Sequence, residues 1–193
     1  MKTLATIVVA ALSFLSLAFS TPVTAGQYIF TTIDNPAGSV NGERTRAFGI
    51  NDAGQIVGDF GAHGFLYSGG IFTTIDVPGA GVTQAFDINS AGQIVGTFSD
   101  STGTHGFLYS GGIFTTIDVP VAGTANGSAT KAFGINNAGQ IVGDFTIGSS
   151  LYGYLYSGGL FTIINFPGAY FTQAFGINDA GQIVGSMGFR GVG

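Results

Sequence analysis

The stretch Ala47-Phe-Gly-Ile-Asn-Asp-Ala-Gly-Gln-Ile-Val-Gly58 decides the fold of this chain, because the sequence contains it several times. Near-copies begin at Ala85, Ala132 and Ala174, so that successive copies start 38, 47 and 42 residues apart. Self-similarity with a period of about 40 residues is typical of repeat architectures. We therefore interpret the chain first as an array of units and only then residue by residue.

Each copy begins with a pattern that predicts a strand. Large and small residues alternate, so Phe48 and Ile50 are expected on one side of the strand and Ala47 and Gly49 on the other. The Asn-Asp-Ala-Gly that follows predicts a tight turn, because Asn and Asp side chains bond nearby backbone and Gly accepts positive φ. The turn leads into a predicted second strand over residues 55–60.

Two further strands complete each unit. His63–Ser68 predicts the third strand, Gly69-Gly70 a short hairpin turn, and Ile71-Phe-Thr-Thr-Ile-Asp-Val-Pro78 the fourth strand and its end. Four strands in about 40 residues are typical of a propeller blade. The small residues of the first strand suit the innermost position, where blades crowd the axis. The predicted fold is all-β: a propeller-like repeat protein with about four four-stranded blades.

The two ends of the array leave its closure open. Tyr28–Asp34 resembles a lone fourth strand, and nothing like a fourth strand follows the last copy. The segment Met187–Gly193 matches the third-strand pattern only at Gly188 and Phe189. We favour a four-bladed, imperfect ring, closed by the leading strand, over an open arc with an incomplete last blade. The alternative to a closed ring is a truncated piece of a longer array.

The first 25 residues predict a secretory signal peptide. Lys2 precedes an apolar run of about 16 residues, and Val23-Thr24-Ala25 offers a small-residue cleavage site. An uncleaved membrane anchor is the alternative. Residues 26–193 would then form one β-repeat domain that is secreted to the periplasm, the cell surface or the medium, with no membrane span after signal removal.

Composition excludes some partners of this domain. Only 8% of the residues are charged and the formal net charge is -5, so the basic surface that nucleic-acid binding requires is absent. The chain has no cysteine, and an exported domain of this kind would hold together without disulfides. A carbohydrate of the cell surface or another extracellular protein remains as the expected partner.

The repeated Ala-Phe-Gly-Ile-Asn-Asp-Ala-Gly-Gln-Ile-Val-Gly and His-Gly-Phe-Leu-Tyr-Ser-Gly-Gly resemble the bacterial extracellular repeats called HAF repeats. The resemblance covers almost everything from Gly26 onward, with Gly64 and Gly106 in place of the Ala of His-Ala-Phe. It implies export and repeated β structure. It implies no activity, cofactor or catalytic residue.

The candidate ligand-binding residues lie where the copies differ most, in the loops before the first strand and after the second. In a propeller these loops share one face, and loops on a rigid scaffold often bind ligands. A long polar side chain precedes each Ala-Phe, and one such loop carries two aromatic residues. The candidates are Arg46, Gln84, Lys131, Gln173, Tyr170 and Phe171. In the alternative interpretation, the four polar residues are solvated at the starts of their strands and the two aromatic residues pack within their loop.

No residue pattern predicts catalysis, so we expect a non-catalytic scaffold or binding module. His63 and His105 hold equal repeat positions, which favours a structural role, and two dispersed histidines cannot build a metal site. Asp59 and Asp144 share a position with Thr97 and Ser186, and would lie in different blades. We expect no cofactor. A lectin-like propeller is the first alternative, and a hydrolase with carboxylates clustered across the ring mouth is a second.

Overall fold

The computed structural model describes residues 29–36, 38, 42–120 and 129–189, and these form fourteen strands in antiparallel meanders. The protein is an all-β, propeller-like repeat protein. The first sheet contains β1 (Thr45–Ile50), β2 (Ile56–Phe60), β3 (His63–Ser68) and β4 (Ile71–Ile75). The second contains β5 (Val82–Ile88), β6 (Ile94–Ser99), β7 (Thr104–Ser110) and β8 (Ile113–Ile117).

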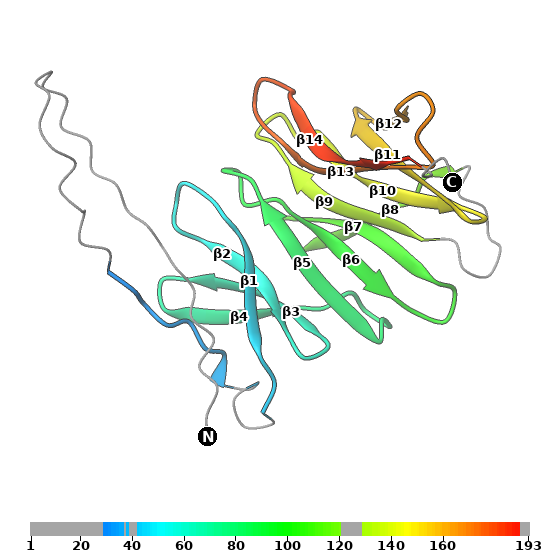
Figure 1. The fold of residues 1–193 in the computed structure, drawn as a ribbon. Coiled ribbons are helices and arrows are strands. Elements are labelled where there is room, and N and C mark those ends of the chain that lie inside the picture. Colours follow the sequence, from blue (N-terminus) through cyan, green and yellow to red (C-terminus); the bar gives the residue numbers. More distant parts are fainter. Residues whose placement is uncertain (1–28, 37, 39–41, 121–128, 190–193) are drawn as a thin grey trace, which may run out of the picture.

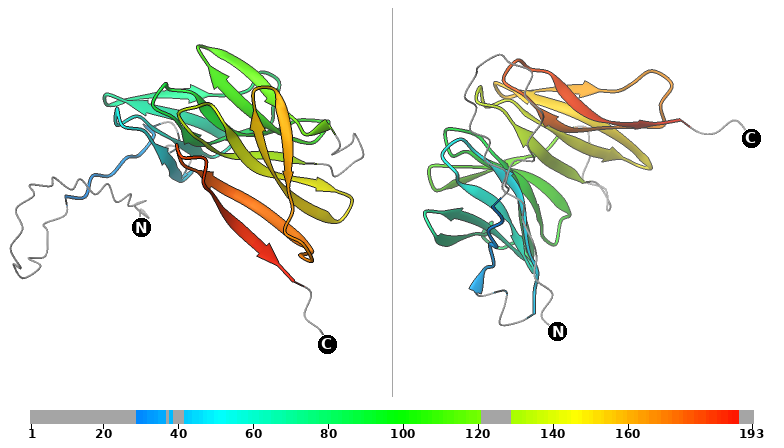
Figure 2. Two further views of the ribbon diagram at one scale, coloured as in Figure 1. Left: turned by 90° about the horizontal axis from the view of Figure 1, so that it is seen from above. Right: turned by 60° about the vertical axis from the view of Figure 1, so that its left-hand side comes forward.

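The third unit is followed by an incomplete fourth. The third contains β9 (Thr130–Ile135), β10 (Ile141–Ile147), β11 (Ser150–Ser157) and β12 (Leu160–Ile164), and the fourth has β13 (Phe171–Ile177) and β14 (Ile183–Gly188). One parallel pair, Leu151 with Phe171, joins β13 to β11. Figure 1 shows the units in succession, and both views of Figure 2 place the leading segment and β14 at opposite ends of an open arc.

The predicted turns are confirmed and have clear local causes. In the first unit, Asn51 Oδ1 accepts hydrogen bonds from the N–H groups of Ala53 and Gln55, and Gly54 takes φ of 73°. The third-to-fourth-strand turn uses Gly69 and Gly70 at φ of 57° and 87°, where any other residue would be strained.

The predicted alternation in the first strand is wrong in one respect, because a register shift in each of the four units marks a bulge at the Phe of Ala-Phe. In the second unit the pairing passes from Ala85 directly to Asp87, leaving Phe86 as the additional residue. A bulge reverses the alternation beyond it, so Ala85 and Ile88 both enter the core while Phe86 is half-buried. Residue types alone do not reveal this shift.

The core of each unit is built from a glycine and an aromatic ring on neighbouring strands. A Cβ on Gly143 of β10 would overlap the carbonyl oxygen of Lys131 and lie 2.9 Å from Cε1 of the buried Tyr154. Gly96 and Phe107 repeat the arrangement in the second unit. The glycine therefore leaves room for the ring in the complete units. In all four copies a Cβ would also overlap a backbone carbonyl oxygen of the neighbouring first strand, and this explains the glycine in every copy.

The leading segment does not form the strand predicted for Tyr28–Asp34, at least over its described residues 29–34. Ile33 packs in the core of the first sheet, and the N–H of Asn35 donates to Oγ1 of Thr45 at 3.0 Å. These contacts fix the segment to the near end of the arc, so it does not close the last unit. The fourth unit is incomplete, and Met187 and Gly188 belong to β14 rather than to a third-type strand.

The predicted signal peptide, residues 1–25, lies outside the described residues. Within the described part of the chain, no helix has the length and apolar character to cross a bilayer.

Candidate functional site

The four long polar candidates occupy equivalent places on the first strands of the four units. Arg46 lies on β1, Gln84 on β5, Lys131 on β9 and Gln173 on β13. The four residues therefore recur once per unit along the arc. Their hydrogen bonds, however, are made largely to carboxylates that sequence reasoning had set aside.

Asp59 of β2 links the first unit to the second. Arg46 donates from Nε to Oδ1 at 2.7 Å and from Nη2 to Oδ2 at 2.6 Å, in a bidentate ion pair. Gln84 of the next unit donates from Nε2 to the same Oδ2 at 2.6 Å. Because Asp59 is fully buried, these three donors supply the charge compensation that burial requires.

Asp144 of β10 makes the corresponding link between the third and fourth units. Gln173 donates from Nε2 to Oδ2 at 2.7 Å, and Lys131 lies opposite Asp144 on the neighbouring strand. Burial raises the pKa of Asp144, and the Gln173 amide and the Lys131 charge only partly offset it. Burial likewise raises the pKa of Asp87, whose carboxylate accepts from the N–H of Ile135 in the third unit.

The junction between the second and third units lacks this carboxylate. Thr97 stands at the position of Asp59 and Asp144, and a cavity of about 250 Å³ opens beside it. We call this cavity the junction hollow. Its lining combines amide, ammonium and hydroxyl groups with apolar surface. The lining residues are Val82, Gln84, Phe86, Thr97, Phe98, Ser99, Thr104, Lys131 and Phe133.

A row of phenylalanine rings runs along the same first strands. The ring centroids of Phe48 and Phe86 are 5.4 Å apart, those of Phe86 and Phe133 also 5.4 Å, and those of Phe133 and Phe175 5.8 Å. Sequence reasoning missed this row. The signal was the Phe of every Ala-Phe, but only the bulge brings these rings next to one another.

The two loop aromatics lie away from the junction hollow, at the next junction along the arc. Tyr170 is half exposed, and its ring meets that of Phe171 edge to face at 4.9 Å. Phe171 begins β13 opposite Leu151. The structure therefore separates these two residues from Gln84 and Lys131, and brings only the latter pair into one cavity.

The histidines pair with aspartates that end the fourth strands. His63 Nδ1 lies 2.8 Å from Asp76 Oδ2, and His105 Nδ1 lies 2.7 Å from Asp118 Oδ2. The common spacing of thirteen residues was the signal for these pairs. Both rings also lie against phenylalanine, with 5.0 Å between the centroids of Phe98 and His105.

Thr102 extends the His105 pair into a chain of contacts similar in outline to a nucleophile, base and acid. Its Oγ1 lies 2.9 Å from His105 Nε2, but the hydroxyl donates its hydrogen to Asp100 Oδ1 at 2.6 Å. The hydroxyl is therefore oriented toward Asp100 and does not give its hydrogen to His105.

The first-to-second-strand turns of all four units meet around a separate polar cavity of about 280 Å³. Asn89 Nδ2 donates to the carbonyl oxygen of Asn136 at 3.1 Å, and equivalent bonds join the other successive turns. Across the described residues, no three His, Asp or Glu side chains gather closely enough to hold a metal ion.

No family model matches the chain, and no curated protein matches it. Among solved structures, a streptogramin B lyase is similar with a TM-score of 0.43 and 18% identity, over 72% of this chain and 53% of that one. The chain thus spans about half the length of that lyase.

Proposed function

We propose that this protein is an exported, non-catalytic binding module of the cell surface or extracellular space, and that the junction hollow binds carbohydrate. One observation carries the proposal: the carboxylate that bridges neighbouring units at Asp59 and Asp144 is replaced by Thr97. At this junction a cavity opens beside the buried Thr97, where the neighbouring junctions have a buried carboxylate.

The chemistry of the hollow suits a hydroxyl-rich ligand. Lys131 donates, Gln84 can both donate and accept, and the hydroxyls of Ser99 and Thr104, which bond each other at 3.0 Å, can do both. Phe86 and Phe133 add apolar surface for the C–H faces of a sugar ring.

The non-catalytic part of the proposal rests on the contacts that the histidines and the buried aspartates make. His105 shares its contacts with two carboxylates and a hydroxyl that is already donating, and His63 has no hydroxyl among its described partners. Asp59 and Asp144 are bonded within separate junctions. General acid–base catalysis requires such groups to converge on one substrate.

The test uses the repeat itself to fill the hollow. Screening the purified protein on a broad glycan array, followed by calorimetric titration of any glycan that binds, should give a dissociation constant for the wild-type chain. Thr97→Asp installs the residue found at the neighbouring junctions, so the fold should persist while the new carboxylate occupies Lys131 and the amide hydrogen of Gln84 that does not bond Asp59. We expect glycan binding to weaken at least about tenfold.

Ser186→Asp is the matched control, because Ser186 has the same position in β14, away from the hollow. It should leave glycan affinity unchanged. The proposal is wrong if no glycan binds, which would favour a passive surface scaffold, or if Thr97→Asp binds as tightly as the wild type. Turnover of a glycoside or ester panel would overturn the non-catalytic part.

A further inference from the structure

Two junctions between units bury the same apolar contact, and at the third Val142 and Ala174 are buried while Ile177 is half-buried. Val57 of β2 packs with Ala85 and Ile88 of the next unit, and all three are buried. Val95 packs in the same way with Ala132 and Ile135. A valine from a second strand therefore meets an alanine and an isoleucine from the following first strand.

At the two ends of the arc, the two halves of this contact are exposed. Val184 of β14 is 66% exposed, whereas its equivalents Val57, Val95 and Val142 are 0% exposed. At the opposite end, Ile50 of β1 is 54% exposed. One end thus carries the valine without its partners, and the other carries the isoleucine without its valine.

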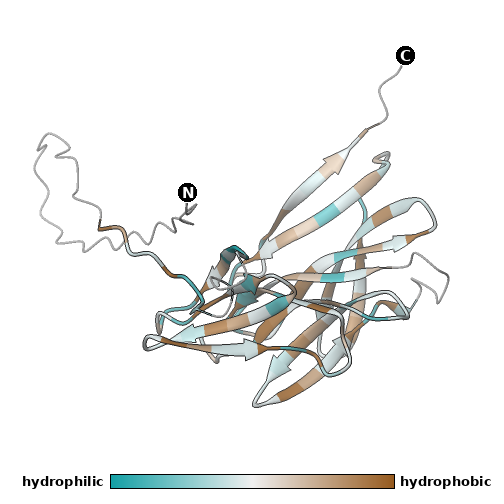
Figure 3. Cartoon of the chain, turned by 90° about the horizontal axis from the view of Figure 1, so that it is seen from below, coloured by the Kyte–Doolittle hydropathy of each residue, from teal (hydrophilic) through white to brown (hydrophobic). Residues whose placement is uncertain are grey.

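The phenylalanine row ends in the same way. Phe48 and Phe175 are each 45% exposed, while Phe86 and Phe133 between them are half-buried by neighbours on both sides. Figure 3 shows hydrophobic residues along both ends of the arc, on the leading segment and on β14. Exposed apolar side chains therefore lie at both places where a further unit would be added.

The polar contacts of the turns stop at these same ends. Asn51, Asn89 and Asn136 each donate from Nδ2 to the carbonyl oxygen of the next turn's asparagine at 3.1 Å. Asn178, the last of the series, donates from Nδ2 only to its own Gln182 among the described residues. A following turn with an asparagine would complete the series, and the turn at Asn51 has one.

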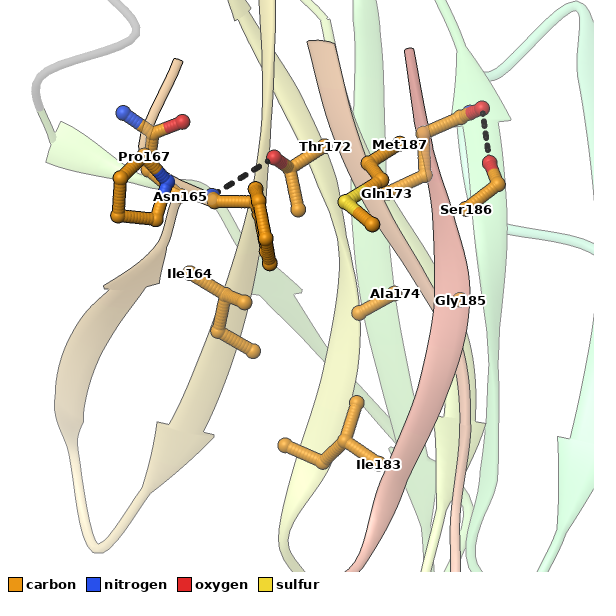
Figure 4. A pocket seen from close by; sticks show the side chains of 11 residues that line it. Ile164, Asn165, Pro167, Thr172, Gln173, Ala174, Ile183, Gly185, Ser186 and Met187 are labelled. Atoms are coloured by element: carbon orange, nitrogen blue, oxygen red, sulfur yellow. Dashed lines mark hydrogen bonds between the residues drawn. The ribbon is translucent and has the colours of Figure 1, made fainter. Parts of the chain in front are cut away.

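Beside β14 the core of the fourth unit is open. A cavity of about 560 Å³ lies between the loop after β12 and strands β13 and β14, with Ile164, Ile183 and Met187 on its walls. Figure 4 shows these side chains around the opening. In complete units an aromatic ring from the third strand fills this place, as Phe107 does in the second.

We infer that a second copy of this chain binds here head to tail, with β1 of the incoming copy packed on β13 and β14. The incoming Ala47 and Ile50 would cover Val184, Phe48 would extend the phenylalanine row from Phe175, and the Asn51 carbonyl would accept from Asn178. We choose this surface because the same hydrogen bond between successive turns forms three times within the chain. The incoming Ile29 and Phe30, 79% and 61% exposed, would arrive beside the open cavity.

Such a contact is heterologous, because the two copies use different surfaces: one contributes β13 and β14 and the other contributes β1. Repetition then gives either a closed ring or an open chain, according to the rotation per copy. The junction also brings Asp179 of one copy near Asp52 of the next, in the place where Asn137 and Asp179 bond internally. Salt should therefore strengthen the association by screening the two carboxylates.

The test uses two single substitutions that each block one end, Val184→Asp and Ile50→Lys. Both side chains are exposed, so each variant should keep the circular dichroism spectrum and melting temperature of the wild type within a few degrees. Sedimentation velocity on the purified protein should show wild-type species larger than one copy. Each variant alone should sediment as a single copy, with association weakened on the order of tenfold or more.

Mixing the two variants gives the decisive result. The Ile50 end of the Val184→Asp protein can still pack on the Val184 end of the Ile50→Lys protein, so an equimolar mixture should form a dimer and stop there. A wild type that remains monomeric at all concentrations and salt levels overturns the inference. So does an Ile50→Lys variant that still associates with itself, since that would indicate a tail-to-tail contact.

Discussion

Tyr154 is the aromatic core residue of the third unit, and replacing it with Phe should stabilise the protein. Its ring is completely buried, and its hydroxyl is the one buried side-chain polar atom in the described residues without a hydrogen-bond partner. Burial and the charges of Asp144 and Asp118 also raise the pKa of this phenol well above its usual value. The equivalent residues Phe65 and Phe107 show that a ring without hydroxyl fills the same place.

The size of the effect follows from the missing bond. A buried hydroxyl without a partner costs about 1–3 kcal/mol, and Tyr154→Phe removes it while leaving the ring contacts in place. We expect the free energy of unfolding to increase by about 1–2 kcal/mol. For a domain of this size the melting temperature should rise by about 2–8 °C.

Urea unfolding followed by circular dichroism measures this difference, provided that the m-values of both proteins agree. Phe107→Tyr is the reverse experiment in the second unit and should lower stability by about 1–3 kcal/mol. A Tyr154→Phe protein less stable than the wild type would refute the reasoning, since it would mean that the hydroxyl has a favourable partner.

Three other substitutions test the junctions and the core. Gly143→Ala should prevent folding, because its Cβ would overlap a backbone carbonyl oxygen. Gly81→Ala, whose Cβ would have only Ser99 O near it at 3.8 Å, should change the free energy of unfolding by no more than about 0.5 kcal/mol. Soluble yield and thermal melting distinguish the two variants. Asn89→Ala should cost about 2 kcal/mol in urea unfolding, since it leaves bonded backbone groups of its turn unpaired, and the exposed Asn178→Ala should cost less. Asp144→Asn should exceed the wild type in stability at neutral pH. The pKa of Asp144 in the folded protein is raised above 3.8, so its protonated side chain contributes stability below pH 3.8, and this contribution is lost as the pH rises through the folded pKa. The stability advantage of Asp144→Asn over the wild type should therefore vanish in acid. A stability difference that does not change with pH would contradict this.

The sequence was a good guide to the strands and turns because their causes are local. The Asn-x-x-Gly turn caps itself through one asparagine side chain, and Gly69-Gly70 takes backbone angles that few other residues allow. Bulges are different. The bulge at Phe86 depends on which residues of β6 lie opposite, and a pattern of large and small residues does not encode that register.

The candidate site was predictable only in outline. The equal repeat positions of Gln84 and Lys131 placed both on first strands. That Gln84 bonds Asp59 of the preceding unit depends on contacts between sheets, which no local pattern reveals. The junction hollow arises from a single exchange, Thr97 for Asp, whose meaning becomes clear only once Asp59 and Asp144 are seen to bridge units.

The hydrogen bonds of the turn asparagines affect the order in which the units unfold. In the described units each turn asparagine joins its unit to an immediate neighbour, so unfolding energy should be distributed along the chain as in a one-dimensional array. The pair β13–β14 has a described neighbouring unit on one side only, and it should exchange its amide hydrogens first. Protection should then increase inward to the second and third units, whose turn asparagines both donate to the next turn and accept from the previous one.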